Sequence, residues 1–421
     1  MKTRVKSSIA GYVGNTLEYY DFSLYASFSP FIARHFFPAE LSADLTLITL
    51  ALAFFMRPIG AILFGYIGDI YGRKKAFGLP MVLVAVFTLS MAIIPSYHEI
   101  GILSSILLIL ARLGQGFCIG GEYGGAVVFT MEHQQNRSLG FIAGLMGSSV
   151  LLGNLLANIL CFLFTLPMFP ESFWRIPFII GASVGLVGAW VRLKAEESPE
   201  FHFDPNHHKV PLLVVIKQYP LSIVRVMACS GLSGLLGTFT FVYLNFFLVN
   251  NLAWPINTSL GLSTCGLLIA FITAPLIGLL NQRYSPLKVM NLCCLACVLT
   301  IPVVFYCIAS NQTLPIVIAM LSFSILVGTC WGSINLLIFK SFPVEVRYTG
   351  VAFCDSIGRI LFSAPIPYIC NTVYANSAGS DYQNMLSGVV VSGIVLLILT
   401  MLNFGRFLRI SRFDTMPLKQ A

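Results

Sequence analysis

Charged residues are scarce in this chain of 421 residues, and their scarcity excludes a water-soluble protein. Asp, Glu, Lys and Arg make up 10% of the sequence, whereas a typical soluble domain has about 25%. Apolar residues make up 57% and form long runs, each able to supply the roughly 20 residues that span a bilayer as a helix. The alternating segments of about ten residues that build a transmembrane β-barrel are absent. The composition predicts an all-α polytopic membrane protein.

The chain also lacks the patterns of enzyme and cofactor sites. The phosphate-binding pattern GxxxxGK[ST] does not occur, and no catalytic or metal-ligand cluster stands at a predicted membrane face. Cys294 and Cys297 form a CxxC pair inside an apolar run, where core packing explains them better than a metal. His207 and His208 lie in a polar stretch, which is better explained as a solvated loop. We therefore predict no enzyme activity, no metal and no cofactor.

The formal net charge of +8 does not indicate a nucleic-acid partner. A nucleic-acid-binding protein clusters its basic residues on one polar face, whereas these Lys and Arg are scattered between apolar runs. Nearly all of those outside the predicted spans fall on the side of the two termini, and only Arg34 and Arg175 fall on the other. Because cytoplasmic loops carry an excess of Lys and Arg, both termini are predicted to be cytoplasmic.

Apolar runs predict twelve transmembrane helices, with edges good to a few residues. A polar stretch divides them six and six, so that two six-helix bundles at 1–193 and 221–421 flank a cytoplasmic linker at 194–220. The predicted spans are 9–33, 43–67, 76–95, 102–130, 138–166, 174–193, 221–249, 256–281, 287–309, 314–339, 348–373 and 385–407.

An internal repeat supports the division into two bundles. The segment 65–75, in which the second span ends, has a degenerate echo at 278–288, and the segment 137–140 is echoed at 347–350. Parallel repeats of this kind are typical of transporters whose substrate site lies at the midplane between the halves. In the fourth span, Gly116, Gly120 and Gly124 recur every four residues, a spacing that predicts close helix packing.

Several motifs carry a family resemblance that extends over nearly the whole chain. The loop Gly65-x-x-Gly-Asp69-x-x-Gly72-Arg73-Lys74 resembles the signature loop of the major facilitator superfamily in residue type, spacing and place. Further stretches resemble the metabolite:proton symporters, a branch that includes bacterial proline/betaine, α-ketoglutarate, citrate and shikimate carriers. These stretches include Gly14-Asn15-x-x-Glu18-Tyr-x-Asp21-Phe22, Arg57-Pro58-x-Gly60, Gly120-Gly121-Glu122-Tyr123, Trp174-Arg175-Ile176-Pro177, Glu196-Glu197-Ser198-Pro199 and Phe342-Pro343-x-Glu345-x-Arg347. In the fourth span, Arg112-Leu-Gly-Gln115-Gly116 is similar to a second motif of the superfamily. The resemblance implies the major facilitator fold and its mechanism, whereas branch members carry different substrates.

The signature loop is predicted to be a gate. Asp69 ends the second span at the surface where the eleventh span begins near Thr349, so its carboxylate lies by the positive end of a helix. The resemblance implies a latch that closes the cytoplasmic side, with Arg73 as charged partner and Gly72 and Arg137 as further gating residues. The alternative is that the loop only orients the helices in the membrane. That role explains its cations but not Asp69 and Gly72.

Three carboxylates inside spans are candidates for proton coupling. A charge at the centre of a span costs roughly 2.5–3.5 kcal/mol on insertion scales, so such residues face the bundle interior and usually have a function. Glu18 and Asp21 share a face of the first span, and Glu122 lies in the fourth. Alternating access changes the surroundings of a buried carboxylate and can load or release its proton. We rank Asp21 and Glu122 ahead of Glu18. The alternative is that these charges pair with one another and lock helices together.

A second set of buried groups is predicted to bind the substrate. Arg112, Gln115 and Glu122 are expected to form one polar stripe, and Asp355 and Arg359 have the i,i+4 spacing of an ion pair. Arg112 and Arg359 are candidates for a substrate carboxylate, because guanidinium binds it in a bidentate manner. The alternatives are an internal salt bridge for Asp355 and Arg359, and a structural role for Arg112 and for Arg57. The predicted substrate-binding set is Arg112, Gln115, Asp355, Arg359, Tyr25 and Trp331.

These inferences describe a secondary active transporter of the bacterial inner (cytoplasmic) membrane, monomeric and multi-pass. It is predicted to import a small organic carboxylate or zwitterion together with protons by alternating access. Its predicted partners are the small-molecule substrate, protons and the lipid bilayer, and nucleic acid is not among them. No cofactor is predicted, because a proton gradient drives the transport. A proton-independent facilitator or exporter on the same fold is the first alternative, and a membrane-embedded nutrient sensor is the second.

Overall fold

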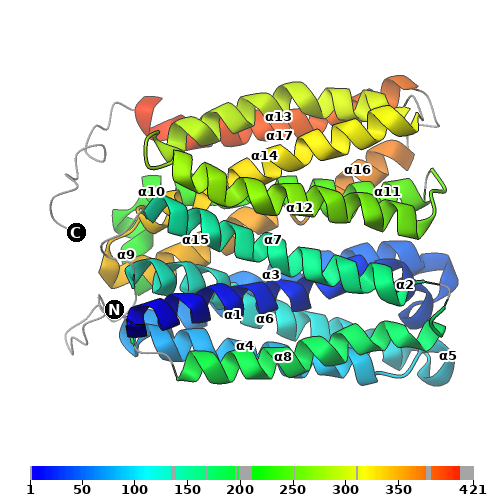
Figure 1. Cartoon of the computed structure of the whole chain (residues 1–421), viewed down its shortest axis with the longest axis horizontal. Coiled ribbons are helices and arrows are strands. Elements are labelled where there is room, and N and C mark those ends of the chain that lie inside the picture. Colours follow the sequence, from blue (N-terminus) through cyan, green and yellow to red (C-terminus); the bar gives the residue numbers. More distant parts are fainter. Residues whose placement is uncertain are drawn as a thin grey trace.

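The computed structural model describes residues 2–133, 139–166, 168–194, 197–198, 211–250, 252–309, 312–375 and 381–407. Throughout these residues the regular elements are helices, which run side by side along the long axis of the molecule (Figure 1). Helix α1 (Lys2–Ser27) begins, and α17 (Asp381–Phe407) ends, at one end of the molecule, which we call the proximal end. Helices α2 (Ser29–Phe36) and α5 (Tyr97–Ile100) lie at the opposite, distal end.

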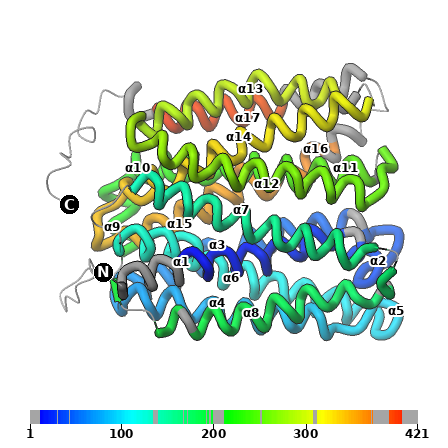
Figure 2. The backbone as a smooth tube through the Cα atoms, in the orientation of Figure 1, coloured from blue at the N-terminus to red at the C-terminus, as the bar shows by residue number. Residues whose placement is uncertain are grey.

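The chain passes back and forth between the two ends, as the tube in Figure 2 traces. The further helices of its first part are α3 (Ser42–Ile70), α4 (Arg73–Ile93), α6 (Ile102–Glu132), α7 (Leu139–Phe164) and α8 (Ile176–Leu193), with short 3-10 turns η1 (Ala39–Leu41) and η2 (Glu171–Arg175). The second part holds α9 (Pro211–Gln218), α10 (Pro220–Thr238), the π-helical turn η3 (Phe239–Tyr243), α11 (Leu244–Asn250), α12 (Ile256–Leu280), α13 (Pro286–Ala309), α14 (Thr313–Phe339), η4 (Val344–Val346), α15 (Arg347–Phe362) and α16 (Ile366–Ala375).

The predicted membrane-spanning character is confirmed for nine helical segments of the described residues, which are long and apolar enough to cross a bilayer. They lie in α3, α4, α6, α7, α8, α10 with its continuation, α12, α13 and α14. Buried charges lower the hydropathy of α1 and α15, and the apolar stretch of α17 is the shorter segment Val390–Asn403. The count of twelve spans and their orientation stay predictions.

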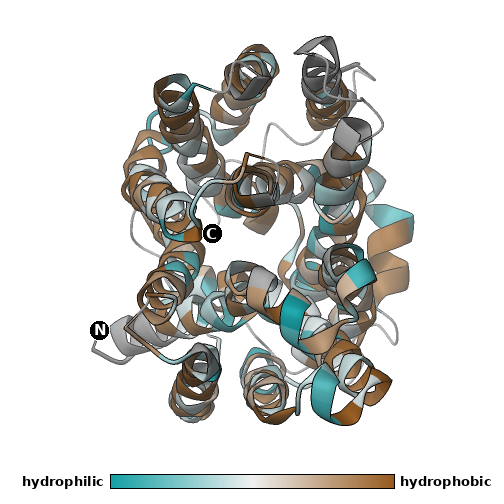
Figure 3. Cartoon of the chain, turned by 90° about the vertical axis from the view of Figure 1, so that its right-hand side faces the viewer, coloured by the Kyte–Doolittle hydropathy of each residue, from teal (hydrophilic) through white to brown (hydrophobic). Residues whose placement is uncertain are grey.

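The outer surface of the helices is apolar, as a lipid environment requires. Phe55, Ile93, Leu292 and Leu299 expose between 55% and 73% of their surface. Seen end-on in Figure 3, hydrophobic colours cover much of the ribbon around the periphery. Exposed apolar area of this extent marks a surface in contact with a membrane or a partner, and the spans identify the membrane.

Two groups of helices meet along the middle of the molecule. In Figure 1, α4, α6 and α8 lie on one side and α13, α14 and α17 on the other, with α7 packed against α12 and α3 against α15 between them. This arrangement is compatible with the two predicted bundles, whose boundaries stay predictions. Helix α9 lies inside the predicted linker 194–220, so that part of the linker is helical and packs against α15.

Glycines bring pairs of helices into backbone contact, as the spacing in the fourth span predicted. A Cβ added to Gly120 of α6 would lie 1.9 Å from the carbonyl oxygen of Arg57 in α3, and one added to Gly116 would lie 2.0 Å from that of Ala53. The same occurs between the two helix groups, where a Cβ added to Gly278 of α12 would lie 2.9 Å from the Cα of Gly144 in α7. Small residues at these crossings allow the close approach.

We expect Gly120→Ala to destabilise the protein by about 1–3 kcal/mol, because the new methyl group has no room beside the backbone of α3. The matched control is Gly261→Ala in α12, where no atom lies within 4 Å of the added Cβ and Ala favours the helix. The measurement is the Tm of the two purified variants in detergent. Equal Tm values for both variants and the wild type would contradict the close-packing account.

Candidate functional site

A central cavity lies between the two helix groups. Its wall combines residues of α1, α3 and α7 with residues of α10, η3, α12, α14 and α15. Its volume of about 100 Å³ exceeds the roughly 10–15 Å³ that one water molecule needs on the same measure. The cavity therefore has room for a small organic molecule, in contact with both groups at once.

The cavity occupies the middle and distal part of the molecule. Helix α3 runs from the distal to the proximal end and contributes Leu50, Phe54 and Arg57, all from its first sixteen residues. Helix α7 runs the other way and contributes Asn154 and Asn158 from its second half. The proximal thirds of these helices take no part in the wall.

The predicted substrate residues separate into two places. Arg359 and Trp331 line the cavity, whereas Arg112, Gln115 and Tyr25 are absent from its described wall. The guanidinium of Arg112 donates to the Gln115 side chain and lies 4.2 Å from the ring centroid of Tyr25, and Gln115 Nε2 donates to Thr88 Oγ1 at 3.1 Å. These three predicted residues therefore form a cluster of their own, buried beside the cavity wall.

Asp355 and Arg359 form the ion pair that their spacing indicates. Arg359 Nε lies 2.8 Å from Asp355 Oδ2, and Arg359 Nη2 lies 3.1 Å from Oδ1. The guanidinium carbon is 5.2 Å from the ring centroids of both Tyr123 and Trp331. Arg359 thus reaches the cavity with its charge already neutralised by a bidentate partner.

The three predicted proton-coupling carboxylates are buried close to the cavity without lining it. Both oxygens of Glu18 and Oδ1 of Asp21 have no hydrogen-bond partner in the described residues. Asp21 faces α8, since a Cβ added to Gly181 would lie 2.2 Å from Asp21 Oδ1 and one added to Gly185 would lie 3.3 Å from Oδ2. Glycines in α8 make the room that this carboxylate occupies.

Glu122 forms an ion pair with Arg192, which the sequence interpretation counted only among the cations on the side of the two termini. Arg192 also donates to the carbonyl oxygen of Phe77 at 3.2 Å, and its guanidinium carbon lies 3.8 Å from the centroid of that ring. The two ends of the predicted stripe of Arg112, Gln115 and Glu122 therefore have different partners. The partners of the pair are 70 residues apart, so no local spacing could indicate it.

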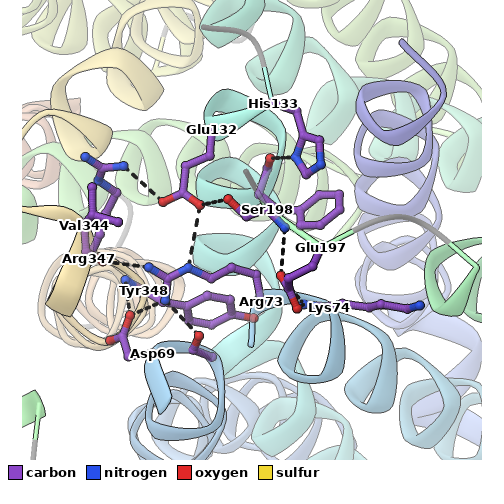
Figure 4. A network of polar contacts seen from close by, with 12 residues as sticks. Asp69, Arg73, Lys74, Glu132, His133, Glu197, Ser198, Val344, Arg347 and Tyr348 are labelled. Atoms are coloured by element: carbon purple, nitrogen blue, oxygen red, sulfur yellow. Dashed lines mark hydrogen bonds and ion pairs between the residues drawn. The ribbon is translucent and has the colours of Figure 1, made fainter. Parts of the chain in front are cut away.

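The proximal end is closed by a polar network around the predicted gate (Figure 4). Asp69 accepts hydrogen bonds from the backbone N–H groups of Tyr348, at 3.2 Å, and Thr349, at 2.9 Å, in the first turn of α15. The positive end of α15 thus holds a carboxylate from α3, as the sequence indicated. Arg73 forms an ion pair with Asp69, and its Nη2 donates to the carbonyl oxygen of Val344 at 2.7 Å.

Glu132 is the centre of this network and was not predicted. Its Oε1 lies 3.0 Å from Arg347 Nη1, and its Oε2 lies 3.6 Å from Arg73 Nε and accepts a hydrogen bond from Ser198. Glu197 accepts from the backbone N–H of Lys74 at 3.2 Å, at the start of α4. The network joins both helix groups and the segment after α8. The sequence offered one indication of this network: Arg347 and Glu197 both belong to stretches that resemble the symporter branch.

Two further gating residues were predicted. Gly72 has a φ of 111° between α3 and α4, a left-handed conformation that favours glycine, and this turn brings Arg73 back onto Asp69. Arg137 lies outside the described residues.

Comparison with known proteins assigns the chain to a family. A sequence model described as Major Facilitator Superfamily matches residues 11–364. The chain belongs to the Major Facilitator Superfamily. It is therefore a membrane transporter and not an enzyme.

The similar proteins span nearly the whole chain. A putative proline/betaine transporter of Staphylococcus aureus (strain MSSA476) is 29% identical over 421 residues, which cover 96% of this chain and 89% of the relative. The inner membrane metabolite transport protein YhjE of Escherichia coli (strain K12) is 29% identical, with 94% of each chain covered. The fold resembles the proton:xylose symporter XylE bound to 6-bromo-6-deoxy-D-glucose, with a TM-score of 0.76 at 14% identity and 96% of each chain covered.

We expect Glu132→Gln to loosen the proximal end, because it leaves the Arg347 and Arg73 guanidinium groups without their shared carboxylate. Removing one partner of a buried pair costs about 3–5 kcal/mol. Hydrogen–deuterium exchange of the backbone at 73–77 and 344–349 should become at least tenfold faster. The matched control is Glu40→Gln, at an exposed distal position. Unchanged exchange in Glu132→Gln would show that the network does not hold the proximal end closed.

Proposed function

We propose that this transporter imports a small organic carboxylate or zwitterion together with protons, by alternating access across the bacterial cytoplasmic membrane. The observation that carries the proposal is the central cavity: both helix groups line it, two arginines reach it, and its described wall contains no carboxylate. A cationic cavity between two movable halves suits an anionic group on the cargo. The cargo is thus bound at the interface between the two halves, which move relative to each other during transport.

The topology in this proposal has twelve passes. Helices α1 and α2 form the first, α10 to α11 the seventh and α15 with α16 the eleventh, while α17 forms the last. Both termini are then cytoplasmic, in agreement with the bias of Lys and Arg between the two sides. Residues 1–193 and 221–421 act as the two rocking bundles, and 194–220 connects them.

The proximal network and the distal position of the cavity support a cytoplasmic gate. With Asp69, Arg73 and Glu132 engaged, the proximal side is closed and the cavity lies in the middle and distal part of the molecule. Import requires the opposite state, in which this network separates and the distal side closes. Gly72 supplies the turn that the latch needs, and Arg137 stays a predicted member of it.

Proton coupling is assigned to Glu18, Asp21 and Glu122. A buried ion without a partner is costly, and a carboxyl group avoids that cost by binding a proton. Glu18 and Asp21 have unpartnered oxygens, and Glu122 exchanges its pairing with Arg192 for a proton when the bundle changes state.

The relatives support the cargo class, since two of them are named proline/betaine transporters, and the name of YhjE supports the inner membrane. The chain acts as a monomer, because each chain contains a complete cavity.

We expect purified protein in liposomes to accumulate L-proline or glycine betaine when the outside is made acidic. Asp21→Asn, Glu18→Gln and Glu122→Gln should each reduce uphill accumulation by at least tenfold, because the proton site is lost. Exchange of internal for external substrate should continue. Asp44→Asn and Glu40→Gln, at exposed distal positions, are the matched controls.

The outcomes separate the alternatives. A facilitator equilibrates substrate without accumulation, an exporter accumulates it in the opposite direction, and a nutrient sensor shows no flux. Full uphill accumulation in all three carboxylate variants would contradict the assignment of coupling to these residues.

A further inference from the structure

Arg57 is the cation of the cavity wall that has no carboxylate partner in the described residues. It contributes to the wall from α3, and 2% of its surface is exposed. Its Nε is buried without a hydrogen-bond partner, and the ion pairs of the described residues do not include it. An arginine held this way inside a membrane protein is expensive, so its charge requires an explanation.

Two aromatic rings hold the Arg57 side chain in place. Its guanidinium carbon lies 4.5 Å from the ring centroid of Phe22 in α1 and 4.4 Å from that of Phe54 in α3. These cation–π contacts orient the guanidinium and offset part of the cost of burial. They leave the buried Nε donor without an acceptor, and an anion in the cavity can supply one.

The backbone of Arg57 is equally constrained. Gly120 of α6 packs directly on its carbonyl oxygen, which fixes the position of α3 at this residue. Rigid support of this kind limits the freedom that the side chain loses on binding a ligand.

The other arginine of the wall differs in its charge balance. Arg359 is engaged by both carboxylate oxygens of Asp355, so the pair is neutral as a unit. The described wall contains no Asp or Glu, so Arg57 is the arginine of that wall without an ion-pair partner, and the nearby Glu18 carboxyl interacts with it through space.

We propose that Arg57 is the anchor for the cargo's carboxylate, and that the cavity takes one carboxylate per molecule. The proposal rests on the transport function proposed above and narrows its substrate class to monocarboxylates and zwitterions. A dicarboxylate or citrate brings a second charge, which finds a cation only if the Asp355–Arg359 pair breaks. The remaining part of the cargo faces Trp331 and Tyr19, whose ring centroids lie 6.2 Å apart. Such rings accept apolar or methylated ammonium groups.

The test compares ligands with and without a carboxylate on the full chain in nanodiscs. L-proline is paired with L-prolinamide, and glycine betaine with choline, and each Kd is measured by radioligand displacement. Wild-type protein should bind the carboxylate member at least tenfold more tightly. In Arg57→Gln the affinity for L-proline should fall about 10- to 100-fold and the preference over L-prolinamide should vanish.

Control variants separate loss of the anchor from loss of the fold. Arg225→Gln removes a cation of α10 outside the cavity wall and should keep the wild-type preference. Arg57→Lys keeps the charge but not the bidentate geometry, and should bind L-proline more weakly than wild type even if Arg57→Gln fails to fold. A wild-type preference retained in Arg57→Gln, or unchanged affinity in Arg57→Lys, would overturn the proposal. So would wild-type protein that binds succinate or citrate but neither monocarboxylate.

Failure of the anchor and failure of the transport function give different results. If Arg57→Gln keeps the preference while wild-type liposomes still accumulate L-proline under a pH gradient, the anchor is wrong and the function stands. If wild type shows the preference but never accumulates substrate, the anchor stands and proton coupling is wrong.

A gain of function provides an independent check. We expect Asp355→Asn to free Arg359 for a second carboxylate, so that succinate affinity rises at least tenfold relative to L-proline. Asp44→Asn, at an exposed position outside the cavity, should leave the ratio unchanged. An unchanged ratio in Asp355→Asn would contradict the argument that charge compensation limits the cavity to one carboxylate.

Discussion

A charge inside a membrane has to be neutralised, and this constraint organises the interior of the protein. Several buried ions are paired in this structure: Asp69 with Arg73, Glu132 with Arg347, Glu122 with Arg192, and Asp355 with Arg359. Other buried charged groups, of both signs, have no ion-pair partner in the described residues. Glu18 and Asp21 have unpartnered oxygens, and Arg57 has aromatic neighbours instead of a carboxylate. In the proposed mechanism these are the groups whose partners arrive from solution, a proton for the acids and the cargo for the arginine.

The paired ions and the remaining ones have different positions in the fold. The network around Glu132 joins the two helix groups at the proximal end, where Arg347 and Arg73 share its carboxylate. The unpartnered acids and Arg57 lie in or beside the central cavity. A transport cycle needs this separation, because the pairs that close one side must break without releasing the cargo. Both members of the Asp355–Arg359 pair belong to one helix, so a movement of one half against the other does not by itself separate them.

Sequence reasoning succeeded where one helix or one surface determines the geometry. Hydropathy and the signature loop indicated the helical membrane fold and the family, the i,i+4 spacing indicated the Asp355–Arg359 pair, and the topology indicated that Asp69 lies by Thr349. Sequence reasoning did not predict contacts between residues that are far apart in the sequence. Glu122 and Arg192 are 70 residues apart, and Glu132 and Arg347 are 215 apart. Helical periodicity shows that Glu18 and Asp21 share a face, but not that Asp21 looks toward α8, which depends on glycines of another helix.

The glycine contact between α7 and α12 has a consequence for how the proximal end parts. Gly144 and Gly278 bring the two backbones together at this crossing without side chains of their own between them. Where two glycines meet, the helices can separate without a change of side-chain rotamer at that contact. In the proposed cycle the proximal network around Glu132 has to break, and because Asp69, Arg73 and Glu132 are buried, salt in solution screens their ion pairs little. Evolution can retune the gate one residue at a time, because a changed charge alters the closed state without repacking the helices behind it.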